Sequence, residues 1–160
     1  MDLRVYSTSK SLQHHLNNVI ATPFDFQPQL GDAHMGLANV SLVHISSLDL
    51  PCLDWLNREI KGTDKVVGIC SDNPNVLEML ECVEAGARAY CNGYMQAANY
   101  QQMLRLLSNG QSWFPPTMLS QALSLAHQEL KGKDTTALLQ ILTAREKEVA
   151  IAVSQGLSNR

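Results

Sequence analysis

The sequence has no long apolar run. None of its hydrophobic stretches approaches the roughly 20 residues that span a bilayer, and its opening, MDLRVYSTSK, has no apolar signal-peptide core. With 45% hydrophobic and 17% charged residues, the chain also lacks the composition of a disordered one. We therefore expect one main folded domain in the cytoplasm, with about 30 residues left for an appendage and no membrane partner.

Clustered positive charge is missing as well. The chain has 12 Lys and Arg against 15 Asp and Glu, a formal net charge of −3, and no Lys/Arg cluster. Proteins that hold nucleic acid neutralise its phosphates with such clusters. We expect this chain, as it stands, to bind DNA poorly.

The four cysteines lack the spacing of a metal site. No CxxC pair occurs, and the cysteines fall mostly in apolar or strand-like runs. Such cysteines are typical of buried free thiols, not of a zinc site or disulfides. The sequence therefore predicts packing roles, with no metal or other cofactor, for Cys52, Cys70, Cys82 and Cys91.

Short β-branched runs alternate with stretches of helical period. The runs are LRVY at 3–6, VSLVHI at 40–45, KVVGIC at 65–70 and RAYC at 88–91, and a short strand is expected near residues 24–26. This alternation indicates a parallel α/β sheet.

Three helices can be placed between and after these strands. One has a face marked by Val76, Leu80 and Val83, and another follows the i, i+3, i+4, i+7 pattern at Tyr100, Met103, Leu104 and Leu107. A third is expected from about residue 116 to 130, because Pro is favoured in a first helical turn. A short, glycine-interrupted helix is expected before residue 40, and KGKDTT at 131–136 is typical of a linker.

The end of the chain contains one complete helix signal and the start of another. Thr143 and Glu146 form a capping box before an apolar periodic run, Gly156 is a helix C-cap, and Ser158 is a second N-cap two residues before the end. One interpretation is a plain C-terminal amphipathic helix. The second cap favours another, in which the chain stops inside a helical domain.

Two stretches resemble a known family. LTAREKEVAIAVSQGLSNR at 142–160 resembles the opening of the LuxR/NarL-type helix-turn-helix domain, and EAGARAYCNGYMQAANYQQML with NGQSWFPP resembles the end of the receiver domain of such response regulators. The resemblance implies a flavodoxin-like, five-stranded parallel sheet of order 2-1-3-4-5, with helices on both faces and further helices at the C-terminus. It assigns residues 1–125 to the receiver, 126–141 to a linker, and 142–160 to a truncated output domain.

The resemblance also implies that the DNA-reading element is absent. In this family a scaffold helix and then a recognition helix follow the first output helix. The chain ends near the start of the scaffold helix, so we expect a fragment of a longer two-component transcription regulator. The output start that is present contains Thr143, Arg145, Glu146 and Gly156; DNA binding is expected only of the full-length parent.

A receiver phosphorylates its own aspartate and needs four kinds of group for this. They are an acidic pair for Mg²⁺, the aspartate, a hydroxyl and a lysine. Aligned by strand ends, these positions hold Ser7 and Thr8, then His44 (or Ser46), then Cys70 (or Ser71), and finally Gly93. The sequence therefore predicts a degenerate pocket that holds no metal and is not phosphorylated by the usual mechanism.

Neighbouring residues offer alternative inputs. His44 is read either as a phosphoacceptor or, preferably, as a packed, hydrogen-bonded residue. Asp49, Asp54 and Asp72 are predicted to be surface carboxylates or caps, with Asp72 or Asn73 as the N-cap of the next helix. In SWFPP, Trp113 and Phe114 match a cyclic di-GMP motif, but prolines replace its hydroxyl residue and arginine; both aromatics are expected to pack the linker against the domain.

Three functions are compatible with these features. The first is a non-enzymatic pseudo-receiver that acts through dimerisation or a regulatory protein partner. The second is a switch with an atypical input, a cyclic dinucleotide or a modification of His44 or Cys70. The third is a pure interaction adaptor. For a homodimer, the family suggests a face built from residues 75–84, 88–91 and 97–108, with Val76, Leu80, Tyr90, Tyr100 and Leu104 as candidates.

Overall fold

The computed structural model describes residues 1–28, 39–48, 54, 56–58 and 64–129. The chain divides into two compact units, Met1–Met118 and Leu119–Arg160. The elements, in order, are β1 (Leu3–Tyr6), α1 (Lys10–Val19), β2 (Asp25–Gln27), β3 (Val40–His44), the 3₁₀ turn η1 (Ile45–Ser47), β4 (Val66–Ser71), α3 (Val76–Glu84), β5 (Ala89–Asn92), α4 (Ala97–Ser108) and α5 (Pro116–Glu129).

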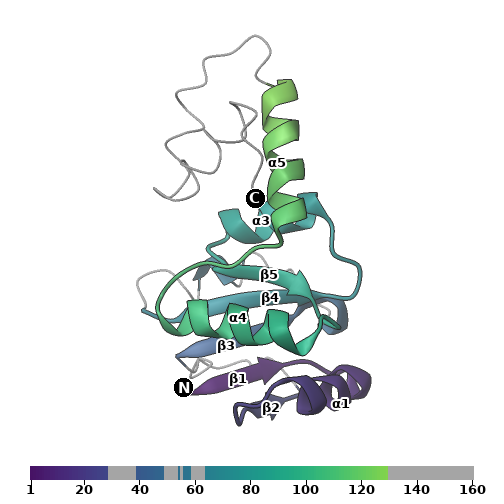
Figure 1. Ribbon diagram of the computed structural model, residues 1–160, viewed down its shortest axis with the longest axis vertical. Coiled ribbons are helices and arrows are strands. Elements are labelled where there is room, and N and C mark those ends of the chain that lie inside the picture. The colour runs from purple at the N-terminus through teal and green to yellow at the C-terminus, as the bar shows by residue number, and fades with distance from the viewer. Residues whose placement is uncertain (29–38, 49–53, 55, 59–63, 130–160) are drawn as a thin grey trace. The chain divides into compact units, whose positions relative to one another are not determined.

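The first unit is built on a parallel sheet of five strands. The strands lie in the order β2-β1-β3-β4-β5, and every neighbouring pair is parallel (Figure 1). The predicted fold class and strand order are therefore confirmed, and each strand lies within one residue of its predicted position. Short β-branched runs with few polar residues suit strands that are covered on both faces.

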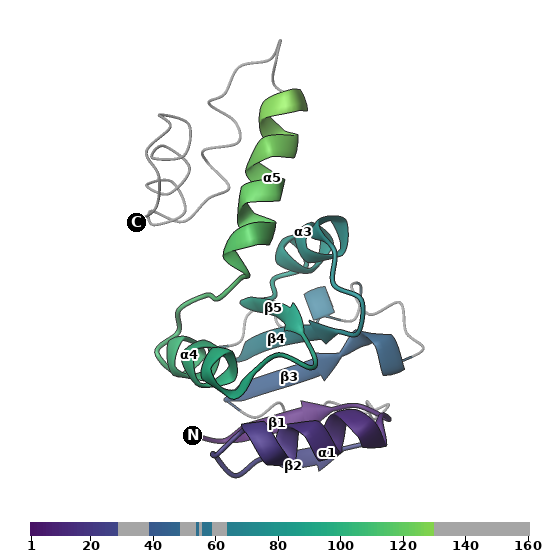
Figure 2. The same cartoon turned by 45° about the vertical axis from the view of Figure 1, so that its right-hand side comes forward.

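Helices cover both faces of this sheet. Alternate residues of a strand point to opposite faces, and those that share a core with α1 and α4 include Leu3, Val5 and Leu42. On β5, Cys91 belongs to the same core, whereas its neighbour Tyr90 points to the opposite face and reaches α3 with its hydroxyl. Figure 2 shows α1 and α4 together on one side of the sheet.

Helix α4 buries its apolar face as predicted. Tyr100, Met103, Leu104 and Leu107 are all buried. Tyr100 and Leu104, which were proposed for a dimer face, are therefore not on the surface, because the i, i+3, i+4 pattern marks the side of α4 that packs on the sheet. Tyr90, also proposed for that face, is a buried residue of β5. The prediction is wrong for these three residues.

Helix α3 has apolar residues on two sides. Met79 and Cys82 are buried, whereas Leu77, Leu80 and Val83 are 64%, 40% and 37% exposed. The predicted face therefore points away from the core. Apolar spacing alone does not distinguish the two sides of a helix that is apolar on both.

The start of α3 also differs from the prediction. Asn75, not Asp72 or Asn73, is the N-cap, and its side-chain oxygen accepts a hydrogen bond from the Glu78 amide at 2.9 Å. Asp72 is thereby left in the loop between β4 and α3, where its side chain is free to bind elsewhere.

The segment after α4 runs beside β5. The Trp113 amide donates to the Arg88 carbonyl at 2.9 Å, and the Tyr90 amide donates to the Trp113 carbonyl at 3.3 Å. Trp113 packs against the core and Phe114 is buried. Both aromatics therefore pack on the domain, and the linker that they were predicted to hold lies outside the described residues.

Several predicted features lie outside the described residues. They are the glycine-interrupted helix before residue 40, Cys52, the linker at 131–136, and the output-domain residues Thr143, Arg145, Glu146 and Gly156. In the part of the chain that the structure does describe, no helix is both long and apolar enough to cross a membrane.

Candidate functional site

The carboxyl ends of three central strands meet at one polar site. Ser7 follows β1, His44 is the last residue of β3, and Asp72 follows β4. Parallel strands end at the same edge of a sheet, which is where open α/β folds place their sites. Ser7 and His44 are completely buried. The structure thus brings together two of the predicted site residues and adds a third.

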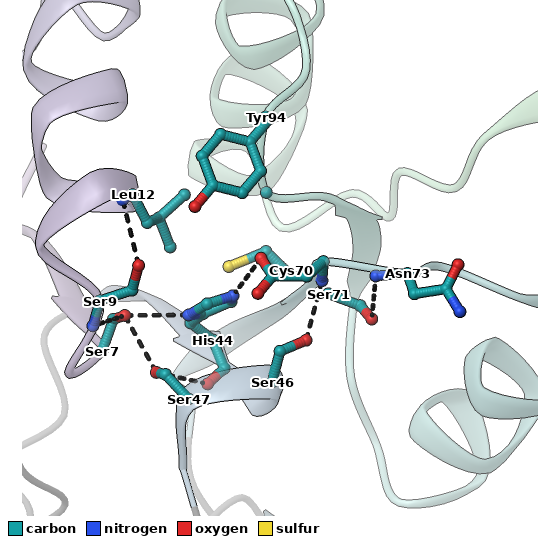
Figure 3. A network of polar contacts seen from close by, with 12 residues as sticks. Ser7, Ser9, Leu12, His44, Ser46, Ser47, Cys70, Ser71, Asn73 and Tyr94 are labelled. Atoms are coloured by element: carbon teal, nitrogen blue, oxygen red, sulfur yellow. Dashed lines mark hydrogen bonds and ion pairs between the residues drawn. The ribbon is translucent and has the colours of Figure 1, made fainter.

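His44 lies at the centre of this site and uses both ring nitrogens. Its Nδ1 is 2.9 Å from the Ser7 hydroxyl, and its Nε2 is 2.8 Å from Asp72 Oδ1 (Figure 3). The Asp72 side chain is 48% exposed, so this contact reaches from the interior to the surface. The preferred interpretation of His44 as a packed, hydrogen-bonded residue is confirmed.

The donor role at one nitrogen of His44 follows from its partner. A carboxylate only accepts, so Nε2–H donates to Asp72. The other nitrogen, Nδ1, shares a hydrogen bond with the Ser7 hydroxyl. The Ser7 oxygen in turn lies 3.0 Å from the Ser47 hydroxyl and accepts from the Ser9 amide at 3.0 Å. The Ser7 hydroxyl therefore takes part in three hydrogen bonds.

Turn η1 is bonded to the loops on both of its sides. The Thr8 amide donates to Ser47 Oγ at 3.1 Å, and the Thr8 hydroxyl donates to the Ser47 carbonyl at 2.9 Å. On the other side, the Asp72 amide donates to Ser46 Oγ at 2.8 Å. Ser46, the alternative nucleophile position, thus anchors a backbone amide.

Asp72 is the site residue that the sequence did not reveal, since a surface or capping role was expected. A signal for it is present in the strand register. Cys70 of β4 pairs with His44 of β3, so a residue two positions beyond Cys70 has the same parity and extends past the strand end toward the histidine. A polar residue at that place is a candidate partner.

Cys70 is buried beside this network and its thiol is inert. Its Sγ is 3.7 Å from the Val43 carbonyl. Burial, followed by the nearby Cys91 and Asp72, raises the pKa of the Cys70 thiol well above its ordinary value. Because the thiolate is the reactive form, this environment disfavours modification of Cys70. Ser71, the other predicted hydroxyl, is also buried, and its oxygen accepts from the Asn73 amide at 3.3 Å.

Gly93 occupies the predicted lysine position at the edge of the site. Its amide donates to the Ser71 carbonyl at 3.0 Å. A Cβ added there would lie 3.2 Å from Leu12 Cδ1 and 3.8 Å from Asp72 Oδ1. A side chain at 93 would therefore point toward Asp72, but the glycine supplies no charge.

The loop after β5 is tied to α1 above the site. The Tyr94 hydroxyl is 2.8 Å from Ser11 Oγ, and His15 Nε2 is 3.0 Å from the Met95 carbonyl. The Tyr100 hydroxyl donates to the Gly93 carbonyl at 2.7 Å. Figure 3 shows the Tyr94 ring above His44 and Cys70, next to Leu12. These bonds hold the loop over the buried network.

On the other face of the sheet, Tyr90 connects β5 to α3. Its hydroxyl donates to Glu78 at 2.5 Å and accepts from the Asn75 amide at 3.1 Å. Burial first, and then the bond to Glu78, raises the pKa of Tyr90 well above its ordinary value. The hydroxyl therefore keeps its proton and stays a donor that holds the first turn of α3 against the sheet.

The order serine, histidine, aspartate invites comparison with a hydrolase triad. A nucleophilic serine must reach a substrate, however, and Ser7 is completely buried with its oxygen already in three hydrogen bonds. Among the described residues, no group of three or more His, Cys, Asp or Glu side chains is placed to hold a metal ion. The arrangement does not support hydrolysis.

The strand order and the polar site at the strand ends define an α/β domain of the receiver type. The chain is 22% identical over 156 residues to the response regulator VraR of Staphylococcus aureus, covering 91% of this chain and 71% of VraR. The predicted resemblance to response regulators is thereby confirmed.

Solved structures agree on the fold. A LuxR-family response regulator from Aurantimonas has a TM-score of 0.64 at 11% identity, over 81% of this chain and 98% of that one. DrrB, an OmpR/PhoB homologue from Thermotoga maritima, has a TM-score of 0.55 at 13% identity, over 69% of this chain. The chain spans only about half, 54%, of the length of DrrB. No protein-family profile matches the sequence.

Proposed function

We propose that this chain is the regulatory pseudo-receiver of a LuxR-type transcription regulator, located in the cytoplasm and independent of aspartyl phosphorylation. The observation that carries the proposal is His44, a buried histidine at the phosphoacceptor position with both nitrogens in hydrogen bonds. A phosphoacceptor needs a free lone pair and access to the donor, and His44 has neither.

The surroundings of His44 support the same conclusion. Phosphoryl transfer is catalysed mainly by positive groups that stabilise the charge of the transferring phosphoryl. Ser7 and Thr8 stand where an acidic pair would bind Mg²⁺, and Gly93 stands where a lysine would pair with the phosphoryl group. The one carboxylate of the network, Asp72, is already paired with His44.

Intact-mass measurement after incubation with acetyl phosphate and Mg²⁺ tests this proposal. We expect the mass of the chain to stay unchanged, and a Ser46→Ala variant, with one hydroxyl fewer near the site, to behave the same. A gain of one phosphoryl group that disappears in His44→Ala would overturn the proposal and favour a switch with an atypical input.

A DNA-binding role is proposed only for a chain that carries the further helices of the family. Specific binding requires side chains that reach base edges and several Lys or Arg contacts to phosphate, and the family places these on helices beyond residue 160. A gel shift on DNA from upstream of its own gene should show no specific binding by this chain and specific binding by a version extended through two further helices. Absence of binding by the extended version would favour the adaptor function.

A homodimer is the proposed form of regulation, and the exposed stripe of α3 is its candidate surface. Leu77, Leu80 and Val83 share one side of the helix and are partly exposed, whereas Tyr90, Tyr100 and Leu104 are excluded by burial. Sedimentation at micromolar concentration should show a species larger than 17.7 kDa. A single monomeric species would instead favour a regulatory protein partner.

A further inference from the structure

A chain of hydrogen bonds runs through the site. The Thr8 amide donates to Ser47 Oγ, which lies 3.0 Å from Ser7 Oγ, and Ser7 Oγ lies 2.9 Å from His44 Nδ1. The Ser47 hydroxyl also donates to the His44 carbonyl at 3.3 Å, and His44 Nε2–H donates to the Asp72 carboxylate. The chain connects the β1–α1 loop, the end of β3 with η1, and the β4–α3 loop, three segments that are separate in sequence.

The contact with Asp72 requires a proton on His44 Nε2. Without it, the lone pair of Nε2 would face a carboxylate oxygen at 2.8 Å, and two acceptors at that distance repel. His44 is therefore the donor at this end of the chain, because a carboxylate has no proton to donate.

Burial makes the inner links of the chain hard to replace by water. Ser7 and His44 are completely buried, and Asp72 is the half-exposed end. Hydrogen bonds in series polarise one another in a low-dielectric interior, and a buried group that loses its partner is costly. The chain should therefore behave as one unit instead of four separate bonds.

We propose that His44 is a built-in latch, which holds the β1–α1 loop, η1 and the β4–α3 loop in one fixed arrangement through this chain. The latch itself depends only on the geometry. Its regulatory meaning, that the arrangement is set by the sequence and not by a signal, rests on the proposed function.

Nitrogen NMR of the unsubstituted chain gives the first test. Long-range correlation within the His44 ring should show a protonated Nε2. A ring whose only proton is on Nδ1 would overturn the hydrogen bond from Nε2 to Asp72, and with it the latch. This measurement needs no variant, so it stands even if a substitution at 44 prevents folding.

The second test uses a matched pair of variants with amide hydrogen exchange as the readout. In His44→Gln the side-chain amide lies near the place of Nε2 and keeps a donor for Asp72, whereas in His44→Asn it lies near Nδ1 and keeps an acceptor for Ser7. The reporters are the amides of Thr8, Ser9 and Asp72, each of which donates to a serine oxygen of the site.

If the hydrogen bonds act together as a latch, either variant weakens the contacts on both the Ser7 side and the Asp72 side of His44. We expect all three amides to exchange about ten-fold faster than in the unsubstituted chain, relative to the amides of α4. An Asn18→Ala control, which removes an exposed side-chain bond to the His14 carbonyl on α1, should leave them unchanged. Faster exchange only of the amides on the side whose bond was removed would overturn the proposal. An increase in exchange rate equal to that of the α4 amides would overturn it as well.

The outcomes for the latch and for the proposed function are separate. If the reporter amides do not change together and the chain gains no phosphoryl group, the latch is wrong and the pseudo-receiver proposal is unaffected. A phosphoryl group on His44 would defeat the pseudo-receiver whatever the exchange rates show.

Discussion

The strand-end site buries polar side chains, whereas the outer side of α3 exposes apolar ones. At the site, Ser7 and His44 are buried, and their polar atoms are hydrogen-bonded to other groups of the protein. On α3, apolar groups are exposed, and Leu77 is the most exposed of them at 64%. The difference separates a site that is held together inside the domain from a helix face that leaves apolar groups open to a contact.

The largest effect expected near neutral pH comes from removing the central histidine. Replacing His44 by leucine leaves the Ser7 hydroxyl and the Asp72 carboxylate without their shared partner, so the free energy of unfolding should fall by about 3 kcal/mol. Denaturant titration measures it, with Ser11→Ala as the matched surface control. A loss equal to that of the control would show that the buried network contributes little and would remove the contrast with α3.

The second effect concerns the buried thiols on the same side of the sheet as the site. Burial raises the pKa of Cys91 from an ordinary value near 9 to about 12. Between these values the unfolded chain loses its thiol proton while the folded chain keeps it. The stabilising contribution is therefore complete below about pH 9 and is lost as the pH rises toward about 12, at about 1.4 kcal/mol per pH unit.

Chemical denaturation at a series of pH values measures this slope. A Cys91→Ala variant should show a smaller slope, whatever its stability at pH 7, because it has one fewer thiol to titrate. An identical slope in the variant would mean that Cys91 does not titrate differently in the two states. Burial also raises the pKa of Cys70. Cys70 should therefore account for part of the pH slope that remains in the Cys91→Ala variant.

A smaller effect is expected at the link between the sheet and α3. Tyr90→Phe removes the hydroxyl that donates to Glu78 and accepts from the Asn75 amide, at a cost of about 1 kcal/mol. Amide exchange at the first turn of α3 should rise while exchange around His44 stays unchanged. Equal changes at both places would show that the two regions are not independent.

The smallest effect on stability is expected on the outer side of α3. Leu80→Glu removes an exposed apolar group, so the free energy of unfolding should change by less than about 0.5 kcal/mol. The same substitution should shift the sedimenting species toward 17.7 kDa if this surface pairs two copies. Gln101→Glu, an exposed position on α4, is a control that adds the same charge elsewhere. An unchanged dimer in Leu80→Glu would exclude the stripe as the interface.

The elements themselves were largely predictable from the sequence. Short β-branched runs fixed the strands, and the i, i+3, i+4, i+7 spacing of Tyr100 and Leu107 identified the buried face of α4. These patterns are local, since a strand or helix needs only its own residues to show which kind of element it is. The same locality explains the error on α3, where apolar residues on two sides left the orientation open.

The candidate site was predictable only in part. Strand ends placed Ser7, His44 and Cys70 together, because parallel strands end at one edge of the sheet. Asp72 was missed, since its role depends on where the α3 cap falls, and Asn75 took that position. The surface role expected of Tyr90 failed for a similar reason, because strand parity had turned it toward α3.

By itself, the sequence determined that the domain is a parallel α/β sheet and that Ser7, His44 and Cys70 stand near the ends of its strands, because alternating β-branched and helical runs are local patterns. Only the tertiary structure decided that Asp72 joins Ser7 and His44 in one network. The two hydrogen bonds of His44, to Ser7 and to Asp72, join segments up to 65 positions apart. Hydrogen bonds over such separations depend on strand order and register, which no local sequence pattern contains.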